Sequence, residues 1–295
     1  MTERIPTANE MYFGNLPREP ARVEALEKTF FKSVGLPNGT WKTTAHRRLD
    51  NLNALAQQFL PANRPLEIMD VACSSGVSTV EWLESLSDAG IECRMTAGDA
   101  SVNAFLLSIG DNLRALVDRK GRVMQYEVAG VGLEVPVRKR KLPRYGLPVL
   151  VLKTMAMLLG PTLSNLKSAA REARWGARWR PVQLVSPSIR GRRDLEVVED
   201  DILVNRSFVR CFHVVRAANI LNLGYFDKAT LVAMLSNLRN RLHDGGVLIV
   251  CRTVPGDVNH GTVFGLDRDR RLRVLARLND GSEIESIALE LPTSA

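Results

Sequence analysis

An acid followed by small residues at alternate positions is the first place in this sequence where chemistry is expected. The apolar run Leu66–Val71 contains Asp70 and leads into Ala72, Ser74 and Gly76. Apolar residues at helical spacing follow, so the pattern predicts a buried strand, a tight turn and a helix. Small side chains there let a ligand approach the backbone, and the helix start presents free N–H groups. The alternative is an ordinary strand-turn-helix with small packing residues.

A second acid, Asp99, ends the next predicted strand, 23 residues after Gly76. Nucleotide-binding βαβ units place a ribose-binding carboxylate roughly 20 residues beyond the glycine turn, because neighbouring parallel strands end side by side. Such a carboxylate accepts hydrogen bonds from both ribose hydroxyls. The alternative is that Asp99 opens a helix. Ser101 is an equally good N-cap for the helically spaced apolar residues of 102–116.

Two later segments are predicted to be buried strands that end in polar residues. Residues 195–202 run from an apolar stretch into Asp200, Asp201 and Ile202. Residues 212–222 form another apolar run, with Asn219 near its end. A helix at 227–242, a turn at 244–246 and a further buried strand at 247–251 complete the series.

In this order the segments resemble the class I S-adenosylmethionine-dependent methyltransferases. The first motif of that family is commonly Asp/Glu-x-Gly-x-Gly-x-Gly. Asp70, Ala72, Ser74 and Gly76 take its four positions, with two glycines replaced, which implies that these four hold the cofactor. The resemblance covers roughly residues 45–118 and 182–254, about half of the chain. It implies an α/β fold: a Rossmann-like, mostly parallel seven-stranded sheet with an inserted helical and hairpin subdomain.

The resemblance implies S-adenosyl-L-methionine as the cofactor and assigns further contacts to it. Asp99 would hold the ribose. Either Asp200 or Asp201 would accept from the adenine amino group, and Ile202 would pack on the ring. Asn219, in an Asn-Ile-Leu phrase, would close over the methionine end.

Methyl transfer from a sulfonium is an in-line displacement on carbon. The cofactor carries the reactivity, while the protein supplies alignment and a dry pocket. No metal is needed, and the sequence shows no metal-ligand cluster. A general base matters for an oxygen acceptor, and Tyr225 and His260 are the candidates because both follow predicted strand ends. The alternative for each is a structural role.

Composition bounds the partners and the compartment. Hydrophobic residues make up 45% of the chain, which is ordinary for a globular protein with a proper core. The net charge of +8 suggests an anionic partner, either nucleic acid or a lipid surface, unless it reflects only an arginine-rich proteome. The four cysteines lack metal-ligand spacing, and Met1–Glu10 shows no secretory signal. These features predict a cytoplasmic protein, with a peripheral position at a membrane as the alternative.

Four segments are expected along the chain. They are an N-terminal lead-in with a helix at 1–45, the first half of the methyltransferase domain at 46–118, an insertion at 119–181 that would form a substrate lid, and the second half at 182–295. The insertion contains a basic run at 138–144 and an apolar stretch, Leu147–Leu159, too short to span a bilayer. Near the C-terminus, two strands are predicted between 262 and 278, followed by a helix at 283–291 that Ser282 would cap.

Residues 163–180 predict a basic amphipathic helix. At helical spacing its cations fall in an arc of roughly 60°, with two tryptophans one turn apart beyond them. These residues are Lys167, Arg171, Arg174, Arg178, Trp175 and Trp179. Such a helix can lie in a membrane interface or grip phosphates. The third interpretation is a helical lid with solvated arginines.

The expected function is therefore methyl transfer to a small-molecule or amphipathic acceptor, lipid-like or a natural product. The alternatives are an RNA or protein methyltransferase and a non-catalytic cofactor-binding scaffold. The scaffold alternative rests on the replaced glycines at Ala72 and Ser74. No Asn-Pro-Pro-Tyr or Asp-Pro-Pro-Tyr phrase and no aromatic-interleaved RNA-binding motif occurs, which disfavours nucleic acid. The sequence sets neither the acceptor nor the oligomeric state.

Overall fold

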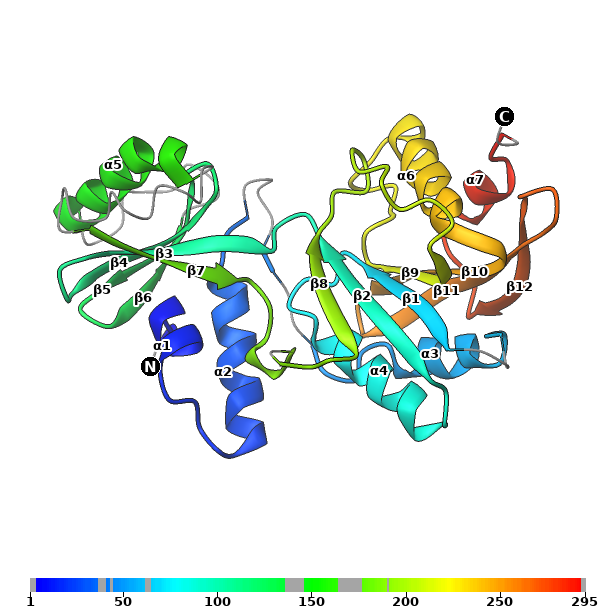
Figure 1. Cartoon of the computed structure of the whole chain (residues 1–295), viewed down its shortest axis with the longest axis horizontal. Helices are drawn as coiled ribbons and strands as arrows, with labels where there is room; N and C mark the ends of the chain where they lie inside the picture. The colour runs from blue at the N-terminus through cyan, green and yellow to red at the C-terminus, as the bar shows by residue number, and fades with distance from the viewer. Residues whose placement is uncertain are drawn as a thin grey trace. The chain divides into compact units, whose positions relative to one another are not determined.

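The computed structural model describes residues 4–36, 41–42, 45–61, 65–135, 146–163, 177–189 and 191–292. The chain divides into two compact units, each assembled from two segments. Unit 1 consists of Met1–Ala45 and Ser101–Ser188, and unit 2 of His46–Ala100 and Ile189–Ala295. Each unit is built around its own β-sheet (Figure 1).

Unit 2 contains a seven-stranded sheet in the order β12-β11-β10-β9-β1-β2-β8. Its strands are β1 (Leu66–Val71), β2 (Cys93–Asp99), β8 (Leu195–Glu199), β9 (Phe212–Ala218), β10 (Leu242–Val254), β11 (Val258–Leu266) and β12 (Leu272–Leu278). Strands β1, β2, β8, β9 and β10 run parallel, and β11 and β12 form an antiparallel edge. The predicted fold class, a mostly parallel seven-stranded sheet of the class I methyltransferase type with an inserted subdomain, is confirmed.

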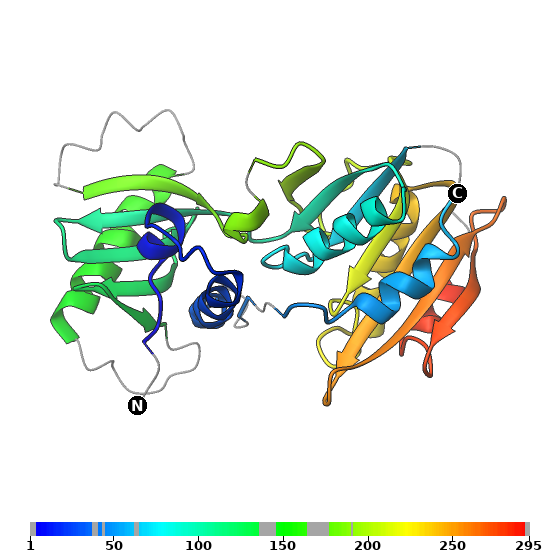
Figure 2. The same ribbon diagram turned by 90° about the horizontal axis from the view of Figure 1, so that it is seen from below.

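Helices cover both faces of this sheet, as Figures 1 and 2 show. Helices α3 (Asp50–Gln57) and α4 (Val77–Asp88) lie on one face, and α6 (Lys228–Arg241) and α7 (Glu285–Leu289) on the other. Asp227 caps α6 by accepting a hydrogen bond from Thr230 N. Strands buried on both faces read as nearly continuous apolar runs, which is why the sequence signals them well. Helix α7 begins at Glu285, two residues later than predicted.

Unit 1 contains a five-stranded antiparallel sheet in the order β6-β5-β4-β3-β7. Its strands are β3 (Asn103–Ile109), β4 (Leu113–Asp118), β5 (Val123–Val128), β6 (Val131–Glu134) and β7 (Ala177–Gln183). Helices α1 (Ala8–Phe13) and α2 (Pro20–Ser33) cover one face, and α5 (Gly146–Leu163) covers the other (Figure 1).

The helix considered for residues 101–116 is wrong, because this segment forms β3 and β4. Ala104 and Leu106 pack toward α1 and α2, while Phe105 and Leu107 pack toward α5. A strand with two buried faces has apolar residues at successive positions, and these also satisfy a helical spacing. The insertion consequently begins at Ser101 rather than at 119, and the N-terminal 45 residues belong to the same unit.

The helix predicted for 163–180 is wrong for residues 177–180, and residues 164–176 lie outside the described residues. Helix α5 ends at Leu163, and Arg178 and Trp179 lie in strand β7, which pairs with β3. Lys167, Arg171, Arg174 and Trp175 lie outside the described residues. Pairing with β3 decides the conformation of the last residues here, since it satisfies their backbone groups in a sheet. Across the described ranges, no helix combines the length and the apolar character that crossing a bilayer requires.

Candidate active site

The loop between β1 and α4 has an unusual backbone. Ala72, Ser74 and Gly76 have φ angles of 56°, 57° and 76°, all in the left-handed region. A non-glycine residue there costs about 1–2 kcal/mol. The loop therefore keeps a glycine-type conformation at the two positions where the sequence has lost glycine. A Cβ added at Gly76 would lie 2.1 Å from Ile189 Cδ1, so packing as well as φ requires glycine at that position.

Asp70 lies beneath this loop and is 2% exposed. Arg216, the opposite residue on β9, donates from Nε to Asp70 Oδ1 at 2.8 Å and from Nη2 to Oδ2 at 2.7 Å. Thr79 Oγ1 donates to the same Oδ2 at 2.5 Å. Both carboxylate oxygens are thus used inside the protein. Asp70 holds β1, β9 and the first turn of α4 together. Contrary to the prediction, its carboxylate does not face a ligand.

Asp99, at the end of β2, is only partly buried. Its Oδ2 accepts a hydrogen bond from Ser74 N at 2.9 Å, and Cys73 N donates to Gly98 O at 3.0 Å. These bonds bring the carboxylate against the left-handed loop, the position that the ribose prediction requires. No helix starts behind Asp99 in the described chain, because β3 follows, so the helix-opening alternative is wrong. The ribose contact itself stays a prediction.

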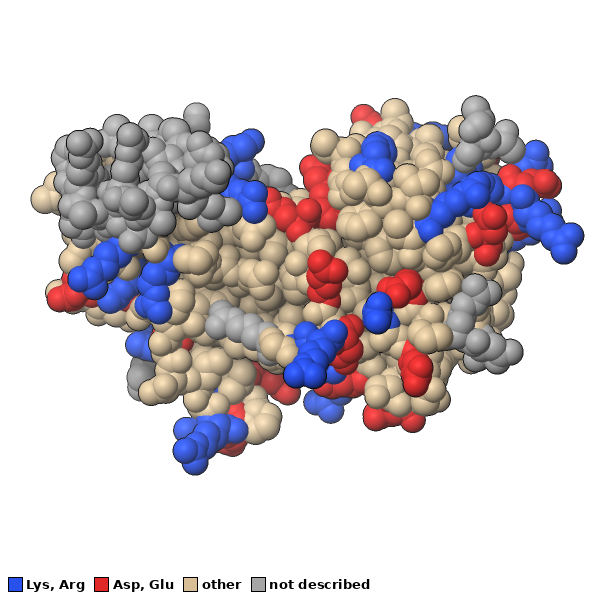
Figure 3. Space-filling model, in the orientation of Figure 1, with Lys and Arg blue, Asp and Glu red and all other residues tan. Residues whose placement is uncertain are grey.

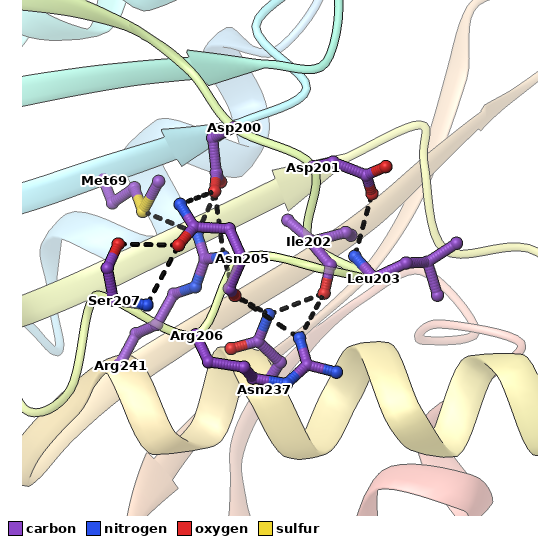
Figure 4. Close-up of polar contacts among 10 residues, drawn as sticks. All are labelled: Met69, Asp200, Asp201, Ile202, Leu203, Asn205, Arg206, Ser207, Asn237 and Arg241. Atoms are coloured by element: carbon purple, nitrogen blue, oxygen red, sulfur yellow. Dashed lines mark hydrogen bonds and ion pairs between the residues drawn. The ribbon is translucent and has the colours of Figure 1, made fainter.

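Asp200, just after β8, is turned into the protein (Figure 4). Its side chain is fully buried and forms a bidentate pair with Arg241, the last residue of α6, with Nη1–Oδ2 at 2.5 Å and Nη2–Oδ1 at 3.1 Å. Asn205 Nδ2 donates to Asp200 Oδ1 at 2.7 Å. Bidentate arginine–carboxylate pairs are strong and geometrically specific. Contrary to the prediction, this carboxylate is not available to an adenine amino group.

The neighbours of Asp200 differ in exposure. Ile202 is 5% exposed and packs in the core between the sheet and α6, so it also fails to offer a surface to an adenine ring. Asp201 is exposed, and its Oδ1 accepts from Leu203 N at 3.0 Å (Figure 4). Of the adenine contacts predicted from the sequence, only Asp201 faces solvent.

Asn219 follows β9 with a φ of 61° and links two strand ends. Its Oδ1 accepts from Thr253 N at 2.6 Å, and its Nδ2 donates to Thr253 Oγ1 at 3.2 Å. Thr253 Oγ1 in turn donates to Asn259 Oδ1 at 2.7 Å. These hydrogen bonds fix the carboxyl ends of β9 and β10 relative to each other. Strand β9 is the neighbour of β1, which leads into the left-handed loop.

The two candidate bases lie farther along the same edge. Tyr225 is 71% exposed in the loop between β9 and α6. His260 lies on β11, with Nδ1 3.4 Å from Oδ2 of Asp280, an acid whose side chain is 94% exposed. An ion pair this exposed contributes little to stability. Tyr225 is therefore accessible, and His260 has only a weak ion pair. Among the described contacts, no hydrogen bond joins the two side chains.

Arg48, in the turn before α3, is a residue that sequence reasoning missed. Its Nε is buried, and no hydrogen-bond acceptor for it is present among the described residues. Burial lowers the pKa of Arg48, although Asp257 and Glu81 lie near enough to favour its charged form. A partly desolvated guanidinium that forms no ion pair among the described residues suits an anionic ligand. An arginine just before an amphipathic helix carries no sequence signal of this role.

Arg216 and Arg241 were missed as well. Arg216 offered one signal, a charged residue inside the apolar run of β9, because such a residue needs a partner when it is buried. Arg241 ends a helix, where a basic residue is ordinary. Only the tertiary structure shows that both arginines are fully buried against carboxylates.

No family model matches the sequence, and no curated protein matches it. Solved structures align with part of its fold. The N-methyltransferase NodS from Bradyrhizobium japonicum WM9, in complex with S-adenosyl-L-homocysteine, shares 12% identity at a TM-score of 0.32, over 76% of this chain and 72% of that one. The PH0226 protein from Pyrococcus horikoshii OT3 shares 12% identity at a TM-score of 0.34, over 82% and 78%.

A third match is the CMeT domain of the citrinin polyketide synthase, with 15% identity and a TM-score of 0.32 over 66% of this chain and 31% of that one. The chain spans only 31% to 50% of the length of the first solved structures that it matches. Similarity at this level supports no assignment of activity, substrate or partner.

Proposed function

We propose that unit 2 binds S-adenosyl-L-methionine at the ends of β1 and β2 and transfers its methyl group to a small-molecule or amphipathic acceptor. One observation carries this proposal. The loop 72–76 has left-handed backbone at Ala72, Ser74 and Gly76, the three positions at which the motif calls for glycine. A chain that bears the strain of left-handed Ala and Ser keeps a loop shape that a ligand needs.

The residues present fit the cofactor at two of its parts. Asp99 offers a partly exposed carboxylate beside the loop for the ribose hydroxyls. Arg48 offers a desolvated cation for the carboxylate of the amino-acid end. Asp200 and Ile202 do not fit an adenine site, so Asp201 is the acid assigned to the amino group. The adenine end is consequently the least pre-organised part of the site.

When bound, the cofactor supplies an electrophilic methyl group on sulfur. The protein's own part is to fix the cofactor through the loop and Asp99, and to align an acceptor with the methyl group. Asn219 and Thr253 keep the ends of β9 and β10 in one geometry. For an oxygen acceptor, Tyr225 and His260 are the candidates to take the proton.

Titration calorimetry with S-adenosyl-L-homocysteine tests the proposal. We expect Asp99→Ala to weaken binding by about 2–4 kcal/mol, because two charge-assisted hydrogen bonds are lost. Asp88→Ala, an exposed acid on the same unit, is the matched control and should bind like the parent. Gly76→Leu is less informative, since its side chain would collide with Ile189 in the folded protein.

Two results would overturn the proposal. The first is a parent protein that does not bind S-adenosyl-L-homocysteine. The second is a folded Asp99→Ala variant that binds within tenfold of the parent. Binding without incorporation of labelled methyl from the cofactor into small-molecule or lipid extracts would favour the non-catalytic scaffold.

A further inference from the structure

The first turns of helix α5 of unit 1 expose three large apolar side chains on the side that faces away from its sheet. Val149 and Leu152 point inward, at 7% and 0% exposure, and pack with the strand residues of β3, β4 and β5. On the outward side Leu147, Leu150 and Val151 are 72%, 57% and 38% exposed. A helix that exposes several large apolar side chains close together is normally covered there. The outward side of α5 therefore needs a cover that this chain does not supply among its described residues.

The charge of unit 1 indicates what kind of cover this is. In the sequence, unit 1 carries 21 Lys and Arg against 10 Asp and Glu, whereas unit 2 carries 19 against 22. Unit 1 thus has a net charge of +11 and unit 2 of −3. The excess persists among the described residues of unit 1, with 13 basic and 8 acidic side chains. Figure 3 shows more basic than acidic side chains over the described part of this unit.

We propose that unit 1 docks on an anionic lipid surface through α5. Leu147, Leu150 and Val151 enter the boundary between headgroups and acyl chains, and Lys153, exposed on the same helix, lies among the headgroups. Apolar area and attraction to anionic lipid add in such binding, and neither alone anchors a protein firmly. A second copy of the chain is disfavoured as the cover, because it would bring two strongly basic units together. The inference is independent of the cofactor proposed for unit 2.

Vesicle sedimentation with the full chain tests this inference. We expect the parent to pellet with phosphatidylcholine vesicles that contain phosphatidylglycerol, and not with pure phosphatidylcholine. Raising the salt concentration should weaken the binding, because it screens the charges. L147E/L150E should weaken it about tenfold or more, since two apolar side chains are lost from the lipid contact. Lys153→Gln should weaken it about fivefold.

The matched control is V204E/V209E in unit 2, where the two valines are 75% and 60% exposed. It should bind vesicles like the parent. The affinity of L147E/L150E for S-adenosyl-L-homocysteine should equal that of the parent. This measurement separates the membrane test from the test of the cofactor site. The inference is overturned if the parent ignores anionic vesicles, or if L147E/L150E binds them as well as the parent does. It is also overturned if an RNA oligonucleotide binds more tightly than vesicles and the substitutions leave that binding unchanged.

Discussion

The ends of three neighbouring strands in unit 2 carry acids of the same kind but in opposite environments. Asp70 on β1 and Asp200 after β8 are buried in bidentate pairs with Arg216 and Arg241. Asp99, at the end of β2 between them, is partly exposed and accepts from the backbone of the left-handed loop. The flanking acids are buried in ion pairs within the protein, whereas the central acid keeps the partial exposure that the proposed ribose contact requires. A motif acid is therefore not by itself a binding residue.

The largest expected effect is on the flanking pairs. Asp200→Ala should lower the free energy of unfolding by about 3–5 kcal/mol, because it leaves the Arg241 guanidinium buried without its carboxylate. The double variant D200L/R241M should recover most of this loss, since no charge remains buried. Denaturant unfolding measures both. A single variant as stable as the parent would show that the Asp200–Arg241 pair does not stabilise the fold.

The reverse pattern is expected at Asp99. Asp99→Ala should leave the free energy of unfolding within about 1 kcal/mol of the parent, because this acid, unlike Asp200, is only partly buried and water can replace its carboxylate as the acceptor for Ser74 N. Its loss of about 2–4 kcal/mol should appear in cofactor affinity instead. Unfolding with and without S-adenosyl-L-homocysteine separates the two quantities. A large loss of stability in the free protein would place Asp99 in the same class as Asp200.

Cys251 reports on how dry the Asp70–Arg216 end of the sheet is. Burial raises the pKa of this β10 thiol to about 12, although Arg216 and Arg48 act in the opposite direction. The folded state then holds a proton that the unfolded state releases near pH 9. Stability should fall by about 1.4 kcal/mol per pH unit between pH 9 and 12.

Denaturant unfolding at pH 9 and at pH 10.5 checks this sign. Over that interval the free energy of unfolding of the parent should fall by about 2 kcal/mol more than that of the Cys251→Ala variant. The comparison uses only the slope with pH, because the substitution also removes packing. Equal slopes would mean that water reaches this end of the sheet.

The smallest expected effect concerns the loop itself. Ala72→Gly removes about 1 kcal/mol of left-handed strain but makes the unfolded chain more flexible by a similar free energy. The free energy of unfolding, measured by thermal unfolding, should therefore change by no more than about 1 kcal/mol. Cofactor affinity should stay near that of the parent. A strong stabilisation would show that the strain is larger than this loop geometry implies.

Unit 2 was predictable from the sequence to a large extent, and unit 1 was not. The strands at 66–71, 93–99 and 212–218 are apolar runs bounded by turn signals, and Asp227 marks the start of α6 with its cap. These signals are local, so one sequence suffices to find them. In unit 1 the strand β3 faces two cores, and its successive apolar residues fit a helix equally well.

The residues of the site divide in the same way. The position of Asp99 behind the glycine turn follows from the length of one helix and one strand, so the sequence alone could place it. The sequence alone also determined the charge, the order of strands and helices in unit 2 and the apolar character of residues 147–159. All of these depend on residue type and short-range spacing.

Only the tertiary structure decided which acids face inward. Asp70 and Arg216 are 146 residues apart in the chain, and they meet because β1 and β9 are neighbours in the sheet. Asp200 meets Arg241 because α6 ends beneath the loop after β8. Pairing across such distances depends on the register of the whole sheet, and local propensity does not encode it. A third contact of this kind joins Ser74 N to Asp99 Oδ2, 25 residues apart, and Ser74 has a left-handed φ there.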